Sequence, residues 1–162
     1  PFGGSILDGS YRFGVWRHSA VKLSVEAKEE DGPAVGAADG VYLTLDQGLW
    51  ERADRRLAIF AQGGWGETDR SAVSRYFGGG LTFSAPFKGR SNDIMGVGVA
   101  YAEIGDLERT GPGNNTEAVL EVFYKYALYE WLTLNPDIQW VQRPGGDDRA
   151  AFVAGLRVAT VF

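Results

Sequence analysis

The sequence predicts an all-β fold, an antiparallel transmembrane β-barrel, and three observations lead to this class. Eight segments alternate between apolar and polar side chains, which is the period of a β-strand. No apolar run approaches the roughly 18 residues that a transmembrane helix needs. The 162 residues include 23 glycines and 13% aromatic residues, a composition typical of barrel walls.

The eight segments are bounded by turn-forming or charged residues, and each is long enough to cross a bilayer at a tilt. They cover residues 10–20, 40–49, 56–67, 73–85, 93–105, 116–128, 131–142 and 150–162. The charged stretch 48–56 is the best alternative for a helix, but it is short, and we interpret it as a turn. The sequence therefore predicts eight strands and no helix.

The alternation is clearest in the first strand and the last three. Their apolar positions are Tyr11, Phe13, Val15; Ala118, Leu120, Val122, Tyr124, Tyr126, Leu128; Leu132, Leu134, Ile138, Trp140; and Phe152, Ala154, Leu156, Val158, Phe162. The opposite face of the same strands carries charged, amide, glycine and a few aromatic side chains. Each strand thus has an apolar face and a polar face.

Alternation alone does not decide which face points outward, because a soluble barrel buries its apolar face and a membrane barrel exposes it to lipid. Tyr and Trp recur near strand ends on the apolar face, as at membrane interfaces. The last predicted strand ends with Phe162 on that face, an ending typical of outer-membrane barrels. Both features favour lipid outside and water inside.

The connections between the strands fall into two alternating sets. Residues 51–55, 86–92 and 129–130 form mostly compact turns, whereas 21–39, 68–72, 106–115 and 143–149 include long polar loops. Outer-membrane barrels have this asymmetry, with the short turns on the periplasmic side.

Charge and composition exclude several function classes. The net charge is −5, and no cluster of Lys and Arg offers the basic stripe that nucleic acid requires. The chain has no cysteine, so no disulfide framework is expected. His18 lacks the second histidine or the Ser/Asp partners of a metal site or catalytic triad. We therefore expect no enzyme, metal or cofactor.

Several local motifs occur together and in a recognisable order. They include Gly40-Val-Tyr-Leu-Thr-Leu-Asp-Gln-Gly-Leu-Trp50, Gly89-Arg-Ser-Asn-Asp93, Asn135-Pro-Asp-Ile-Gln139 and Gly155-Leu-Arg157. On these motifs the chain resembles the C-terminal half of the carbohydrate-selective porin (OprB) family. The resemblance covers most of the chain, and the motifs are specific in combination.

The resemblance implies passive diffusion of small sugars, monosaccharides such as glucose, across the outer membrane of Gram-negative bacteria. Family members form barrels of about sixteen strands from longer chains, so residues 1–162 are expected to be the C-terminal barrel portion. Its partners would be the missing N-terminal half and outer-membrane lipid, and the sequence leaves a homo-oligomer open. One alternative is a small closed eight-stranded barrel with an anchoring role and no conduction, since such a barrel has no room for a solute. Another is a soluble ligand-binding barrel.

A sugar offers hydroxyl groups and an apolar ring face, so a sugar channel needs charged, amide and aromatic side chains in its lumen. The positions on the polar faces are Arg12, Trp16, His18, Asp46, Glu117, Glu121, Lys125, Asp137, Gln139 and Arg157. These residues either contact the sugar or form salt bridges that stiffen the wall, and the sequence leaves both roles open. Arg90 and Asp93 are expected to clamp the Gly89 turn by a charge-assisted hydrogen bond.

Overall fold

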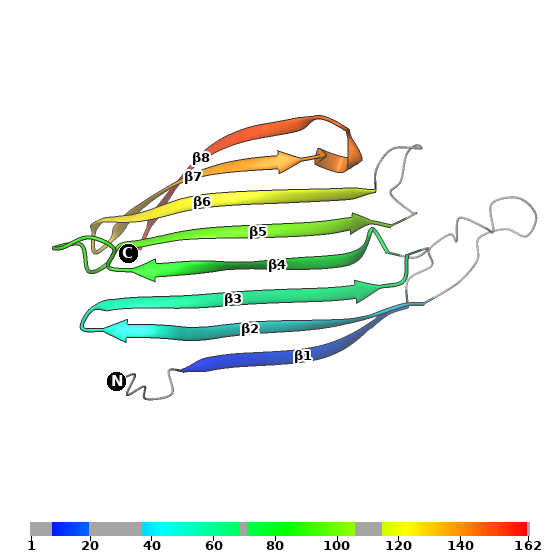
Figure 1. Ribbon diagram of the computed structural model, residues 1–162, viewed down its shortest axis with the longest axis horizontal. Coiled ribbons are helices and arrows are strands. Elements are labelled where there is room, and N and C mark those ends of the chain that lie inside the picture. The colour runs from blue at the N-terminus through cyan, green and yellow to red at the C-terminus, as the bar shows by residue number, and fades with distance from the viewer. Residues whose placement is uncertain (1–7, 20–36, 69–70, 106–114, 162) are drawn as a thin grey trace, which may run out of the picture.

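The structure, a computed structural model, describes residues 8–19, 37–68, 71–105 and 115–161 and contains eight strands (Figure 1). In chain order these are β1 (Gly9–His18), β2 (Ala38–Arg52), β3 (Arg55–Gly66), β4 (Val73–Ser84), β5 (Ile94–Ile104), β6 (Thr116–Tyr129), β7 (Leu132–Gln142) and β8 (Ala150–Thr160). A 3-10 turn, η2 (Pro144–Gly146), precedes β8. All eight predicted strands are present, and Phe162 lies outside the described residues.

Within the described residues, no helix is long and apolar enough to cross a membrane.

The strands form one sheet in the order β1 to β8, and each adjacent pair is antiparallel. Each strand therefore pairs with its neighbours in sequence, as in a series of hairpins (Figure 1). We call the end with the connections 53–54, 85–93 and 130–131 the short-turn end. At the opposite end, which we call the long-loop end, β1, β3, β5 and β7 end and β2, β4, β6 and β8 begin.

The turn predicted within residues 48–56 is present, but it is shorter than expected. β2 continues to Arg52 and β3 begins at Arg55, so the turn consists of Ala53 and Asp54, with Ala53 at a φ of 56°. A register shift between Gly48 and Trp50 accommodates one extra residue as a bulge. Beyond it, Trp50 lies near Phe83 on the next hairpin, with 6.4 Å between ring centroids.

The sheet has no apolar core among its described residues. The only buried apolar side chains there are Ala38 and Ala85, whereas Phe13 and Phe152 on the apolar face are 72% and 73% exposed. A soluble barrel or sandwich would bury this face. The exposed band suits a hydrocarbon environment instead, and the soluble-barrel alternative is not supported.

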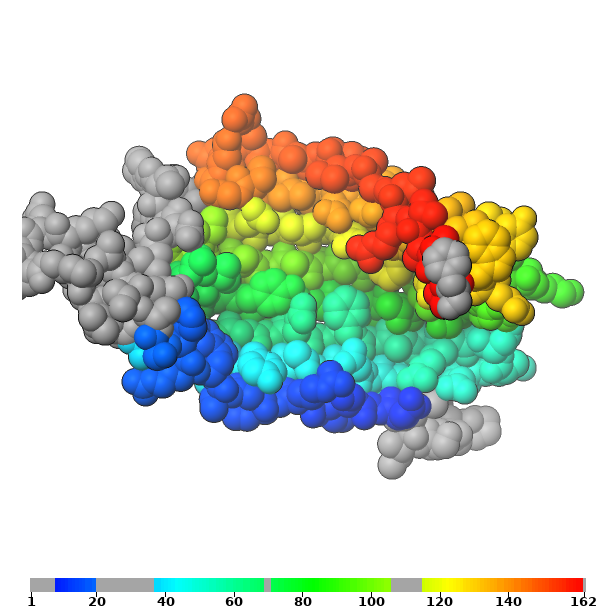
Figure 2. Space-filling view, turned by 180° about the vertical axis from the view of Figure 1, so that it is seen from behind, coloured from blue at the N-terminus to red at the C-terminus, as the bar shows by residue number. Residues whose placement is uncertain are grey.

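The sheet is open at both edges. No ladder joins β1 to β8 in the part of the chain that the structure describes, and the two strands lie at opposite margins of the sheet (Figure 2). A small closed barrel would require that ladder. In a membrane, an edge strand must find a partner for its backbone N–H and C=O groups.

The polar face of the sheet as candidate functional site

All of the predicted lumen positions lie on one face of the sheet, which we call the polar face. The register fixes this, because Asp46 pairs with Ser10 on β1 and Phe60 on β3, while Glu121 pairs with Gln139 on β7. Alternation along each strand then places the others on the same side. They are Arg12, Trp16 and His18 on β1, Glu117 and Lys125 on β6, Asp137 on β7 and Arg157 on β8.

Seven of the predicted charged positions on this face have no ion-pair partner among the described residues: Arg12, Asp46, Glu117, Glu121, Lys125, Asp137 and Arg157. The ion pairs of that part of the chain are Arg17–Asp39, Arg56–Asp8, Arg75–Glu103, Arg90–Asp93 and Arg149–Asp147. None of them contains any of these seven residues. A salt-bridge lattice among the predicted charges is therefore not formed, and these groups face the space beside the sheet.

Asp137 and Glu117 are held by neighbours. The Asp137 carboxylate accepts a hydrogen bond from the Gln139 side chain at 3.2 Å and lies over Gly155, where a Cβ would collide with it. Glu117 accepts a hydrogen bond from the Gly145 N–H at 2.7 Å and so fixes η2, in which Gly145 has a φ of 63°. Glu117 thus has a structural role that its strand parity did not reveal.

Aromatic rings on the polar face were largely missed by the sequence analysis, which singled out Trp16 alone. The four rings and the neighbouring-strand glycines that they cover are Trp16 over Gly40, Tyr42 over Gly14, Phe60 over Gly80 and Phe123 over Gly96. At each of these glycines a Cβ would collide with the ring. The pattern depends on strand register, so it becomes visible only once the register is known.

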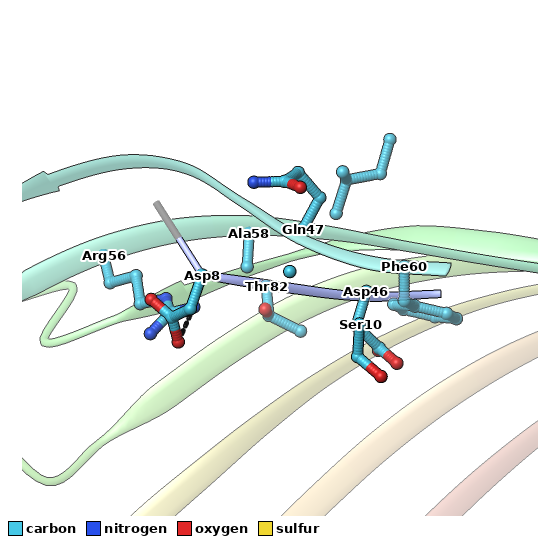
Figure 3. Close-up of a pocket in the computed structure, with 10 residues that line it drawn as sticks. Asp8, Ser10, Asp46, Gln47, Arg56, Ala58, Phe60 and Thr82 are labelled. Carbon is cyan, nitrogen blue, oxygen red and sulfur yellow. Dashed lines mark hydrogen bonds and ion pairs between the residues drawn. The ribbon is translucent and has the colours of Figure 1, made fainter. Parts of the chain in front are cut away.

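A hollow of about 300 Å³ opens near the short-turn end of β1 to β4 (Figure 3). Its polar-face lining consists of Asp8, Ser10, Asp46, Arg56, Ala58, Phe60 and Thr82. Arg56 Nη2 lies 3.2 Å from Asp8 Oδ2, at the rim. Gln47 borders the same hollow but points to the other side of the sheet (Figure 3). The hollow combines carboxylate, guanidinium, hydroxyl and aromatic groups.

Arg90 and Asp93 form a bidentate ion pair across the Gly89 turn, with N···O distances of 2.7 and 2.9 Å. Asp93 is 1% exposed and also accepts hydrogen bonds from the Tyr124 hydroxyl at 2.5 Å and the Ala127 N–H at 2.9 Å. Burial opposes ionisation of Asp93, but the bonds from Arg90, Tyr124 and Ala127 outweigh it, and the pKa lies below the usual 3.8. The pair therefore attaches the β4–β5 turn to β6.

In the described part of the chain, no group of three or more His, Cys, Asp and Glu side chains could hold a metal ion. The side chains on this face offer hydrogen bonds, charge and ring contacts.

The profile of the family described as "Carbohydrate-selective porin, OprB family" matches residues 2–162. The chain belongs to the OprB family. This assignment places it in the outer membrane of Gram-negative bacteria, in agreement with its exposed apolar face.

The OprB-family chain is similar to Porin B of Pseudomonas aeruginosa, with 26% identity over 99% of this chain and 42% of that porin. Its fold is similar to that of the high-pH structure of Pseudomonas putida OprB, with a TM-score of 0.79 and 26% identity over 95% of this chain and 44% of that one. The low-pH structure of the same porin shares the fold at a TM-score of 0.61 and 21% identity, over 94% and 46% of the two chains. The OprB-family chain therefore spans less than half the length of these relatives.

Proposed function

We propose that this chain is the C-terminal barrel portion of an outer-membrane porin for passive, carbohydrate-selective diffusion of small sugars such as glucose. The observation that carries the proposal is the division of the sheet into an exposed apolar face and a polar face with charges free of ion pairs. Facing lipid on one side and water on the other, such a wall needs neither catalysis nor a cofactor.

The open edges support the view that a further set of strands completes the barrel. An N-terminal half would pair with β1 and β8 and satisfy their backbone groups. A barrel of about sixteen strands then leaves an aqueous channel, which eight strands alone do not. In this arrangement the short-turn end is periplasmic and the long-loop end is extracellular.

The free charges on the polar face suit weak recognition of sugar hydroxyls. Carboxylates accept and guanidinium or ammonium groups donate hydrogen bonds, and charge strengthens each bond. Binding at such a wall must remain weak, because a solute that enters must also leave. We infer that Arg12, Glu121, Lys125 and Arg157 serve the sugar path.

The test is permeation through the full-length protein in liposomes, comparing glucose with amino acids of similar size. Faster swelling with glucose is expected, and equal rates would sink the claim of selectivity. Glu121→Gln should weaken glucose-dependent block of single-channel current about fivefold, because a charged acceptor becomes neutral.

Glu117→Gln is the matched control, since Glu117 lies on the same strand and face but its carboxylate is bound by the Gly145 N–H. Glucose block in this variant should equal that of the wild type. Equal losses in both variants would contradict a specific role for Glu121.

A further inference from the structure

Phe60 lines one end of the hollow near the short-turn end of the sheet, and Arg56 lines the other end (Figure 3). The ring extends from β3 across Gly80 on β4 towards Gly98 on β5, and a Cβ atom added at each of these glycines would lie 2.8 and 3.6 Å from ring carbons. Because both neighbours lack side chains, the ring lies along the sheet. Phe60 is only half-buried and lines the hollow, so part of the ring is available to a ligand.

Polar groups line the hollow beside this ring, on the same side of the sheet (Figure 3). Asp46 is the direct cross-strand neighbour of Phe60, and Ser10 is the next across the ladder. The Asp46 side chain is exposed and belongs to no ion pair among the described residues. Thr82 lines the hollow from β4, so hydrogen-bonding groups come from both strands that flank β3.

The rim adds a donor and a second carboxylate. Arg56 is held by Asp8 at 3.2 Å, but its side chain remains 36% exposed and retains further N–H donors. Two carboxylates, Asp8 and Asp46, stand against one guanidinium, so the formal charge of the hollow is −1. This charge disfavours an anionic ligand.

The volume of about 300 Å³ lies at the lower end of the range for small-molecule sites. It suits one monosaccharide ring and not an oligosaccharide. An apolar ring face bordered by hydroxyl, carboxylate and guanidinium groups is complementary to a pyranose, which has apolar C–H faces and hydroxyl groups at its edge.

We infer that this hollow is a binding subsite for one neutral pyranose, with Phe60 as the stacking platform and Asp46 as the principal hydroxyl acceptor. The inference rests on the proposed function and names where along the wall the sugar is held. Because the subsite lies at the short-turn end, it is the last binding position of the sugar before the sugar is released into the periplasm.

The test is a glucose titration of single-channel current in the full-length porin. Phe60→Leu keeps an apolar filler over Gly80 but removes the flat ring face. It should raise the half-blocking glucose concentration roughly two- to tenfold, the range of an aromatic contact, and leave the salt conductance unchanged. Tyr42→Leu is the control, because Tyr42 covers Gly14 outside the hollow, and its glucose block should match that of the wild type.

Asp46→Asn provides an independent readout that does not alter packing volume. It should raise the half-blocking glucose concentration and increase permeation of gluconate relative to glucose. This prediction holds even if Phe60→Leu fails to assemble.

The outcomes separate the subsite from the function. An unchanged glucose block in Phe60→Leu, or an unchanged gluconate-to-glucose permeation ratio in Asp46→Asn, would overturn the proposed subsite. If the wild-type protein is still glucose-selective, the proposed porin function stands. Equal losses in Phe60→Leu and Tyr42→Leu would also overturn the proposed subsite, because binding would not be localised. A wild-type protein without preference for glucose over amino acids would remove the proposed function itself.

Discussion

Asp93 is the largest fully buried side chain among the described residues, and it joins two regions that lie far apart in sequence. The pairing with Arg90 could be predicted from the Gly89–Asp93 motif, because the two residues lie three positions apart in the turn that follows Gly89. The bonds from Tyr124 and Ala127 could not be predicted, because they depend on how β6 lies beside β5. The ion pair within the turn was thus predictable from the sequence, whereas the hydrogen bonds from β6 to Asp93 were not.

Asp93→Asn should lower the free energy of unfolding of the full-length porin by about 2 kcal/mol near neutral pH, because charge-assisted bonds are lost. The pKa of Asp93 is lowered in the folded state, so its stabilisation is complete above the usual value of 3.8 and is lost as pH falls through the folded pKa. Urea unfolding in lipid vesicles, from about pH 7 to about pH 3, should show the difference between wild type and variant shrinking at the acidic end.

Asp147→Asn is the control for this substitution. Asp147 also pairs with an arginine, Arg149 at 2.8 Å, but both side chains are exposed. Its replacement should leave the unfolding midpoint unchanged. If Asp147→Asn lowers the free energy of unfolding as much as Asp93→Asn does, burial of the ion pair is not the cause of the destabilisation.

At the scale of elements, the glycines of β4 and β5 differ in how much room they have. A Cβ at Gly80 would collide with the Val97 carbonyl oxygen and lie 2.9 Å from the Gly98 Cα, whereas one at Gly98 would have its nearest neighbours at 3.6 and 3.7 Å. The two residues face each other across the ladder. Substitution of each by alanine therefore compares a crowded glycine with an uncrowded one at the same place in the sheet.

Gly80→Ala should destabilise the barrel by about 2 kcal/mol, because backbone atoms of β5 cannot yield as a side chain would. Gly98→Ala should be neutral or stabilising by about 0.5 kcal/mol, since alanine restricts the unfolded chain more than glycine. Refolding yield and urea midpoints measure both. Similar effects of the two substitutions would refute the argument from backbone contact.

Strand alternation allowed all eight strands to be predicted, but the bulge after Gly48 was not. Alternation is a periodic signal, and a bulge interrupts it. The charged residues 51–56 resembled a turn because charge favours solvent exposure and says little about extended backbone. The end of β2 was therefore placed too early.

At the scale of the whole molecule, the division into two faces was predictable because side-chain direction follows parity along each strand. The pairing of rings with glycines and the hollow beside Phe60 were not, because both require the register between strands. The candidate residues of the polar face were therefore identified by type, whereas the interactions of Glu117 and Asp137 emerged only from the structure.

The open sheet predicts that residues 1–162 refolded alone in detergent will form no conducting channel, because the outer edges of β1 and β8 are unpaired in the described sheet. Co-refolding with a separate chain that carries the preceding half of the porin should restore conductance. Planar-bilayer recordings of the chain alone and of the mixture measure this. Stable conductance from the chain alone would contradict the proposed completion of the barrel.

The strict pairing of sequence neighbours also has an evolutionary consequence. In the described sheet each strand pairs only with its neighbours in sequence. A hairpin can therefore be duplicated or deleted while the remaining strands keep their pairing partners. Removal of a single strand would reverse the direction in which all later strands cross the membrane. The circumference of such a barrel therefore changes in steps of two strands. The width of a pore built in this way therefore changes in discrete steps, and the duplication or deletion of one hairpin is one such step.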